Sequence, residues 1–101
     1  MAEIVWTEPA LSDLDAIADY IALDKPNAAS ALVARVFFHI EKLSDNPELG
    51  SIPRELRPLK TYRQIVEPPC RIFYRVRDDQ VFIVHVLRGE RQLRRKNLTP
   101  R

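Results

Sequence analysis

The side chains best suited to chemistry in this chain are arginines on two predicted strands near its carboxyl end. Arg71 and Arg75 alternate with apolar residues along one strand, and Arg88 ends the next. If Asp78–Asp79 is the two-residue turn between these strands, Arg71 and Arg88 become diagonal neighbours on one face of the sheet, roughly 7–8 Å apart at the backbone. Cations gathered there would stabilise a phosphate, a carboxylate or the charge that develops in a transition state.

The same register predicts what surrounds these arginines. Their face of the sheet carries four apolar side chains, Phe73, Phe82, Val84 and Val86. We expect the helices to cover the opposite face, where His85 lies among aliphatic side chains, and the arginine face to stay open. An apolar floor bordered by cations suits an acidic amphipathic peptide or a splayed nucleotide. The alternative is that each arginine is solvated or pairs with a local acid such as Glu55 or Glu67.

Charge is unevenly distributed along the chain. Residues 1–53 carry three basic and nine acidic side chains, whereas residues 54–101 carry thirteen basic and five acidic ones. The formal net charge of +2 conceals this difference. A surface with so much charge of one sign concentrates counter-ions and repels itself, so it usually faces a partner. That partner is nucleic acid, an acidic protein segment, or each in turn.

Length and composition limit the classes of protein to consider. A chain of 101 residues with 46% hydrophobic and 30% charged residues predicts a single globular domain spanning 1–101. No segment resembles a signal peptide or a membrane-spanning helix, so we expect no membrane association. The lone Cys70 excludes an internal disulfide and fits a reducing compartment, the cytoplasm. His39 and His85 have no ligand-like spacing, so we expect no metal and no cofactor.

The periodicity of apolar residues predicts the elements that must position these side chains. Spacings of three and four predict helices over about 9–23 and 28–46, with Thr7 and Asn27 as N-caps. Alternation of period two predicts strands over 3–7, 61–67, 70–77 and 80–87. The proline-rich residues 47–60 are expected to be a loop. The resulting order is β-α-α-β-β-β, an α+β fold in which a helical hairpin packs on one face of an antiparallel sheet.

Three groups of residues carry a family resemblance. The first group is Val5-Trp6-Thr7, Ala10-Leu11-Ser12-Asp13-Leu14 and Ile17-Ala18-Asp19-Tyr20-Ile21. The second is Pro26, Ala28-Ala29, Ile40, Leu43, Pro47 and Leu49-Gly50. The third is Tyr62-Arg63-Gln64-Ile65, Arg71-Ile72-Phe73-Tyr74-Arg75-Val76, Asp78-Asp79 and Val81-Phe82-Ile83-Val84-His85-Val86-Leu87-Arg88. In order and spacing the chain resembles the RelE/ParE superfamily of small toxins from bacterial type II toxin–antitoxin systems. The resemblance implies the same fold, and an antitoxin whose carboxyl-terminal segment lies over the helices and sheet.

One branch of that superfamily, the RelE-like members, cuts messenger RNA in the ribosome. Without a metal, their basic side chains help the ribose 2′-hydroxyl attack the adjacent phosphate. Arg71 and Arg88 match two of these cations, and Lys60 or Arg63 is the candidate for a further one. Such chemistry also needs a group that moves protons. RelE-like enzymes commonly place a tyrosine or histidine shortly beyond the position of Arg88, but this chain reads Gly89-Glu90-Arg91-Gln92-Leu93-Arg94. Glu67 is a candidate base, and we interpret His85 as a buried core residue.

The other branch, the ParE-like members, is similar in fold but blocks DNA gyrase and has no nuclease activity. Because this chain keeps two of the arginines and lacks an evident proton shuttle, it resembles this branch more closely, and we expect it not to be an enzyme. The residues expected to bind the antitoxin or the target are Arg71, Phe73, Arg75, Phe82, Arg88, Arg91, Arg94 and Arg95. The expected partners are a cognate antitoxin, in a hetero-oligomer, and DNA gyrase, with the ribosome and mRNA as the alternative.

A hypothesis of another class requires no toxicity. The basic sheet would then be a docking module for an acidic amphipathic helix, since arginines beside an apolar floor capture such helices. The antitoxin would use the same surface, so the sequence alone leaves both interpretations open.

Overall fold

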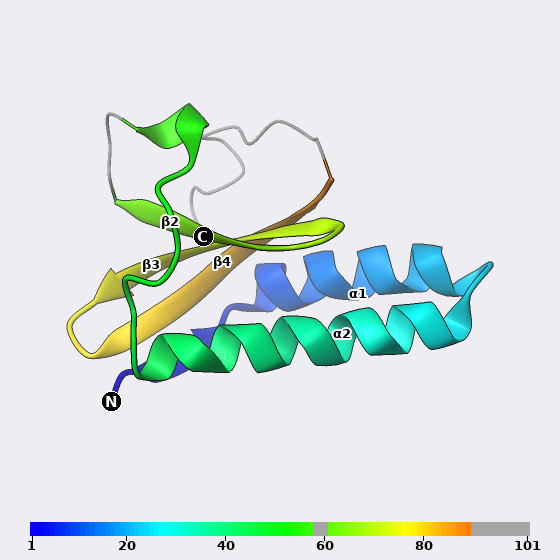
Figure 1. The fold of residues 1–101 in the computed structure, drawn as a ribbon, viewed down its shortest axis with the longest axis horizontal. Helices are drawn as coiled ribbons and strands as arrows, with labels where there is room; N and C mark the ends of the chain where they lie inside the picture. The colour runs from blue at the N-terminus through cyan, green and yellow to red at the C-terminus, as the bar shows by residue number, and fades with distance from the viewer. Residues whose placement is uncertain (58–60, 90–101) are drawn as a thin grey trace.

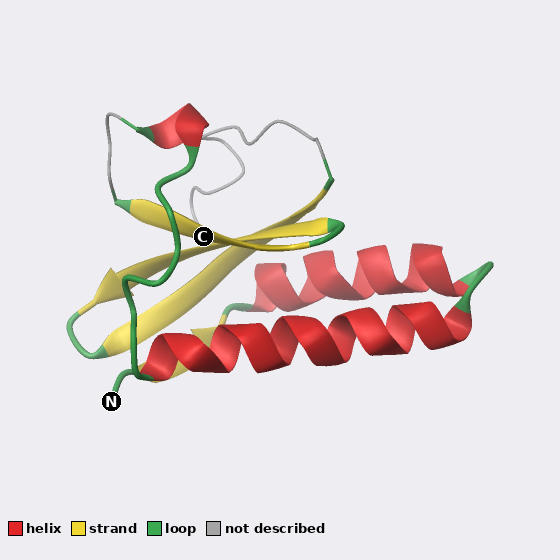
Figure 2. Cartoon of the chain, in the orientation of Figure 1, coloured by secondary structure: helices red, strands yellow, loops and turns green. Residues whose placement is uncertain are grey.

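A computed structural model describes residues 1–57 and 61–89 of the chain. Its elements are β1 (Glu3–Trp6), α1 (Glu8–Ala22), α2 (Pro26–Glu41), the 3-10 helices η1 (Lys42–Ser44) and η2 (Arg54–Leu56), β2 (Tyr62–Glu67), β3 (Cys70–Arg77) and β4 (Gln80–Arg88). This order confirms the predicted β-α-α-β-β-β arrangement and the α+β class. Figures 1 and 2 show α1 and α2 side by side on one side of the sheet and η2 on the other.

Local signals explain where the helices begin. The Thr7 hydroxyl caps α1 by accepting a hydrogen bond from the Ala10 N–H at 3.3 Å, as predicted. The same hydroxyl donates to the Ile83 carbonyl of β4 at 2.7 Å, which ties the start of α1 to the sheet. The prediction that Asn27 caps the second helix is wrong, because α2 begins at Pro26 and has no side-chain cap. Proline suits that position since its fixed φ is helical and a first-turn N–H has no intrahelical partner.

The strands form one sheet in the order β1-β4-β3-β2. The β2–β3 and β3–β4 pairs are antiparallel, but β1 runs parallel to β4, so the expectation of a wholly antiparallel sheet is wrong. The path of the chain from β1 through the two helices to β2 explains why β1 is parallel to β4. The Ala2 N–H donates to the Ser44 carbonyl at 2.8 Å, so the two helices return the chain to the end where β1 begins. Strand β2 starts from that end, and after two hairpins β4 has the direction of β2 and therefore of β1.

The helix-facing side of the sheet builds the main core. Its fully buried side chains from both layers include Leu14, Leu32, Val36, Ile40, Ile72, Tyr74 and Ile83. The Tyr74 hydroxyl donates to the Pro47 carbonyl and accepts from the Gly50 N–H, both at 2.8 Å, and burial raises the pKa of this phenol. Among the described residues, neither helix has the length and apolar character of a segment that crosses a bilayer.

The opposite side of the sheet is also covered over part of its area. Helix η2 places Leu56 against Phe73, Val84 and Leu87, and all four side chains are buried. Because Phe73 and Val84 are 0% exposed, the expectation of an open apolar floor is wrong at these positions. The sequence predicted only a loop here, since a three-residue helix with one buried leucine is too short to show a period.

Candidate binding surfaces

A β-bulge in β4 decides which side chains share a face of the sheet. From the hairpin turn as far as Tyr74, which lies opposite Ile83, the register is as predicted. The next residue of β3, Phe73, pairs with His85 instead of Val84, so β4 contains one extra residue at this point. Since side chains alternate between faces, one inserted residue reverses the facing of every position beyond it.

The bulge separates the two arginines that the sequence placed together. Arg71 pairs with Leu87 and lies on the side of η2. Arg88 lies on the helix side instead, with its guanidinium carbon 4.9 Å from the ring centroid of Tyr20 in α1. Val86 also packs into the main core. The prediction that Arg71 and Arg88 are neighbours on one open face is therefore wrong.

Arg71 fixes η2 to the sheet. Its two terminal nitrogens donate to the two carboxylate oxygens of Glu55 at 3.0 and 2.9 Å, and its Nε donates to Gln64 Oε1 at 3.0 Å. The Arg71 and Glu55 side chains are only 18% and 19% exposed. A bidentate, charge-assisted pair with this little solvent around it is both strong and geometrically specific. The alternative that a strand arginine pairs with a local acid is thus confirmed for Arg71.

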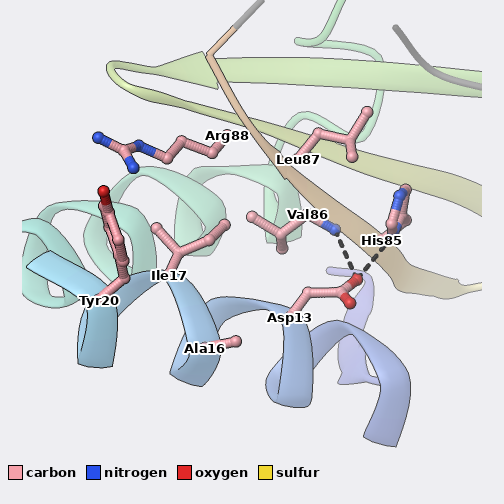
Figure 3. A pocket seen from close by; sticks show the side chains of 8 residues that line it. All are labelled: Asp13, Ala16, Ile17, Tyr20, His85, Val86, Leu87 and Arg88. Carbon is pink, nitrogen blue, oxygen red and sulfur yellow. Dashed lines mark hydrogen bonds and ion pairs between the residues drawn. The ribbon is translucent and has the colours of Figure 1, made fainter. Parts of the chain in front are cut away.

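A groove of about 610 Å³ lies between α1 and the end of β4 (Figure 3). It is lined by Asp13, Ala16, Ile17, Tyr20, His85, Val86, Leu87 and Arg88. Figure 3 shows Tyr20 and Arg88 together at one end and the Asp13 carboxylate directed at β4 at the other. Arg88 is exposed, and no carboxylate within residues 1–57 and 61–89 forms an ion pair with it. The groove therefore offers apolar side chains and, at one end, a cation accessible to a partner.

Asp13 was not predicted as a site residue, yet its carboxylate holds α1 to β4 at and beyond the bulge. Its Oδ2 accepts a hydrogen bond from the Val86 N–H at 3.1 Å and lies 2.6 Å from His85 Nδ1. The pairing of β1 with β4 ends at Trp6 opposite Ile83, so Val86 has no strand beside it on that edge, and the Asp13 carboxylate supplies the acceptor for its N–H. His85 is 7% exposed and stacks on Phe73 with the ring centroids 6.0 Å apart, in agreement with its interpretation as a buried residue. The sequence signals for Asp13 are its place in the Ala10–Leu14 group that carries the family resemblance and its position next to Leu14 at the border of the apolar stripe.

The other candidates for phosphate chemistry lie elsewhere. Arg63 donates to the Gly50 carbonyl at 2.7 Å, on the far edge strand β2. Glu67, the candidate base, lies 3.0 Å from Nδ1 of His39 in α2. Four further predicted residues lie outside the described ranges, namely Lys60, Arg91, Arg94 and Arg95.

The described arginines that were expected to meet at one phosphate lie apart from one another. Arg63, Arg71 and Arg88 each contact a different part of the molecule, and Arg71 and Arg88 lie on opposite faces of the sheet. Cleavage of RNA needs several cations and a proton carrier around a single phosphate. Within the part of the chain that the structure describes, no three His, Cys, Asp or Glu side chains are grouped to hold a metal ion.

A solved structure of a toxin–antitoxin system shares this arrangement. The chain matches one titled "Chromosomal ParDE TA system from P. aeruginosa" with a TM-score of 0.74 and 25% sequence identity, covering 89% of this chain and 98% of that one. The two-helix, four-stranded fold of this chain is therefore one found in a ParDE toxin–antitoxin system.

Sequence comparisons identify the family. The profile described as "ParE toxin of type II toxin-antitoxin system, parDE" matches residues 4–93. Toxin RelE2 of Caulobacter vibrioides is 39% identical over 92 residues, which are 90% of this chain and 99% of that toxin. Toxin ParE3 of the same organism is 30% identical over 95 residues, 92% of each chain. The chain belongs to the ParE toxin family of type II toxin–antitoxin systems, and membership implies a cognate antitoxin as partner.

Proposed function

We propose that this ParE-family toxin arrests growth by inhibiting DNA gyrase in the cytoplasm, and that its cognate antitoxin reverses the inhibition. The match of residues 4–93 to the ParE profile supports gyrase as the target, because the resemblance to ParE-like toxins implies it. One relative bears the name RelE2, so ribosome-dependent cleavage of mRNA is the outcome against which the proposal must be tested.

The separation of Arg71 from Arg88 is the observation that favours gyrase inhibition over RNA cleavage. The nuclease interpretation requires both guanidinium groups at one phosphate, whereas Arg71 is bound to Glu55 and Arg88 lies against Tyr20 on the other face. Moving Arg71 toward Arg88 would break a bidentate pair and leave the Glu55 carboxylate without its cation, at a cost of about 1–3 kcal/mol. The same separation is compatible with a toxin that acts by binding alone.

We propose that the antitoxin contacts the groove between α1 and β4. The apolar side chains of Ile17 and Val86 line it, and Arg88 is placed to bind a carboxylate of an acidic segment. Arg91, Arg94 and Arg95, which follow Arg88 in the sequence, complete the proposed contact. Charge reversal by Arg88→Glu is expected to weaken antitoxin binding at least tenfold, while Lys25→Glu at the α1–α2 turn leaves it unchanged.

The target is tested with purified components. Increasing amounts of the toxin are added to gyrase and relaxed plasmid, and to translating ribosomes with a defined transcript. The proposal predicts loss of supercoiling, its recovery when the antitoxin is added, and an intact transcript. Cleavage of the transcript together with normal supercoiling would reject gyrase as the target. If expression of the chain leaves growth unchanged, it is a docking module and the proposal is wrong.

A further inference from the structure

A row of half-buried side chains crosses all four strands on the side of the sheet away from the helices. Its members are Val5 of β1, Phe82 of β4, Arg75 of β3 and Tyr62 of β2, which the register places opposite one another in that order. Neighbouring strands lie about 4.8 Å apart, so the row extends about 14 Å across the sheet. We call these four residues the sheet row.

A cation stands between two aromatic rings in this row. The guanidinium carbon of Arg75 lies 4.7 Å from the ring centroid of Phe82. In the part of the chain that the structure describes, no carboxylate forms an ion pair with Arg75. Its position differs in this respect from that of Arg71, four residues earlier on the same face, whose charge is taken up by Glu55. Arg75 is therefore available to an external anion.

The rest of the fold holds the sheet row in position. Tyr62 and Phe82 pack on one edge of the cluster that Leu56 forms with Phe73 and its neighbours, yet both rings remain partly exposed. Aromatic rings fixed in this way lose little conformational freedom when a ligand stacks on them. On the other side of the row, Arg77 is exposed and follows Arg75 on the same face at a distance of about 6.6 Å along the strand.

We propose that the sheet row binds single-stranded DNA. Unpaired bases stack on Phe82, Tyr62 or the Arg75 guanidinium, and successive phosphates meet Arg75 and Arg77. Partly exposed rings beside arginines on a sheet are the surface that sheet-based single-strand binders offer to bases. An acidic helix would instead need a groove for its side chains, as between α1 and β4. The choice of DNA over RNA rests on the proposed function, since gyrase acts on DNA.

Binding is measured directly, without gyrase, by fluorescence anisotropy of the full chain with a labelled 20-residue oligothymidylate over a range of salt concentrations. Phe82→Leu is expected to weaken binding at least about fivefold, the lower end of the effect of losing one stacked base. Arg75→Gln is expected to flatten the plot of log K against log salt by about 0.7, because one phosphate contact is lost. Lys25→Gln removes the same charge at the α1–α2 turn and leaves both quantities unchanged. Thermal melts confirm that each variant is folded.

Three further ligands decide between the occupants of this surface. A duplex of equal length is expected to be insensitive to Phe82→Leu, because its bases cannot stack on protein rings. Equal sensitivity of the duplex, or no effect of either sheet-row variant, would overturn the proposal. If oligouridylate binds tenfold tighter than the DNA, the choice of DNA is overturned. If oligoglutamate competes with the DNA at equal concentration, the sheet row binds anions in general and the proposal of a single-stranded DNA site is overturned. These results are independent of the supercoiling assay, so either proposal can fail without the other.

Discussion

Removing the Asp13 carboxylate is the sharpest perturbation that the structure suggests, because one of its oxygens contacts two polar groups of β4. Asp13 Oδ2 accepts from the Val86 N–H at 3.1 Å and lies 2.6 Å from His85 Nδ1. In the Asp13→Ala variant the Val86 N–H and His85 Nδ1 both lose the carboxylate oxygen as a partner, in a site that is largely closed to water. The side chain of His85 is 9% exposed and that of Asp13 22%.

The expected loss can be estimated from these contacts. A buried polar group left without its partner costs about 1–3 kcal/mol, so two groups in a partly buried site amount to about 2–4 kcal/mol. This is a large fraction of the roughly 5–15 kcal/mol that stabilises a typical domain. For a chain of this size, 1 kcal/mol lowers Tm by about 4–8 °C, and Asp13→Ala is therefore expected to lower it by about 8 °C or more. Asp13→Asn keeps one oxygen as an acceptor and should lose about half as much.

Two measurements test this reasoning. Urea unfolding followed by circular dichroism gives the change in the free energy of unfolding, and amide hydrogen exchange reports on the Val86 N–H itself. We expect exchange at Val86 to accelerate in Asp13→Ala while amides near the turn at Asp78–Asp79 keep their protection. A loss of less than about 0.5 kcal/mol, the range of a neutral surface substitution, with unchanged exchange at Val86 would refute the role of Asp13.

Three further predictions concern the other contacts that position these surfaces. A double-mutant cycle of Arg71→Gln and Glu55→Gln, followed by urea unfolding, is expected to give a coupling energy of about 1–2 kcal/mol, and a value near zero would show that the pair does not hold η2. Gly50→Ala is expected to lose about 1–3 kcal/mol by the same assay, because a Cβ would lie 2.5 Å from the Gln64 carbonyl oxygen, and unchanged stability would contradict this contact. Burial raises the pKa of the Tyr74 phenol, so its neutral form is favoured in the folded state; this contribution to stability is complete below the ordinary pKa of about 10 and is lost as the pH rises through the raised pKa. Unfolding titrations above pH 10 should show this decline in the native chain and less of it in Tyr74→Phe.

The parts of the fold that the sequence predicted are those with strong local signals. Cys70–Arg77 was predicted to the residue, and the turn at Asp78–Asp79 was placed correctly because aspartate tolerates the left-handed conformation that Asp78 adopts with φ 56°. Thr7 was recognised as a cap since its hydroxyl precedes an amphipathic helix. These features depend on a few neighbouring residues, and the sequence alone therefore determines them.

The sequence does not predict the bulge in β4. For that reason the face of the sheet on which Arg88 lies was predicted wrongly. From Val81 to Leu87 the strand is apolar at all but one position. The register of β3 and β4 with the bulge and the register without it therefore both bury apolar side chains, and the alternation of apolar residues does not favour either one. Asp13, whose carboxylate bonds to this part of β4, is 73 residues away from Val86 in sequence, so no local pattern shows the contact. The parallel pairing of β1 and the cover that η2 provides are likewise tertiary features without a local pattern.

Inhibition of gyrase by this toxin should be visible in the topology of plasmid DNA in living cells. Plasmid DNA is isolated shortly after the toxin is induced and its topoisomers are resolved, while total mRNA from the same cells is probed for cleavage. We expect a loss of negative supercoiling with intact mRNA, and recovery of supercoiling when the antitoxin is co-expressed. Unchanged topoisomers with mRNA cut in its coding regions would contradict it.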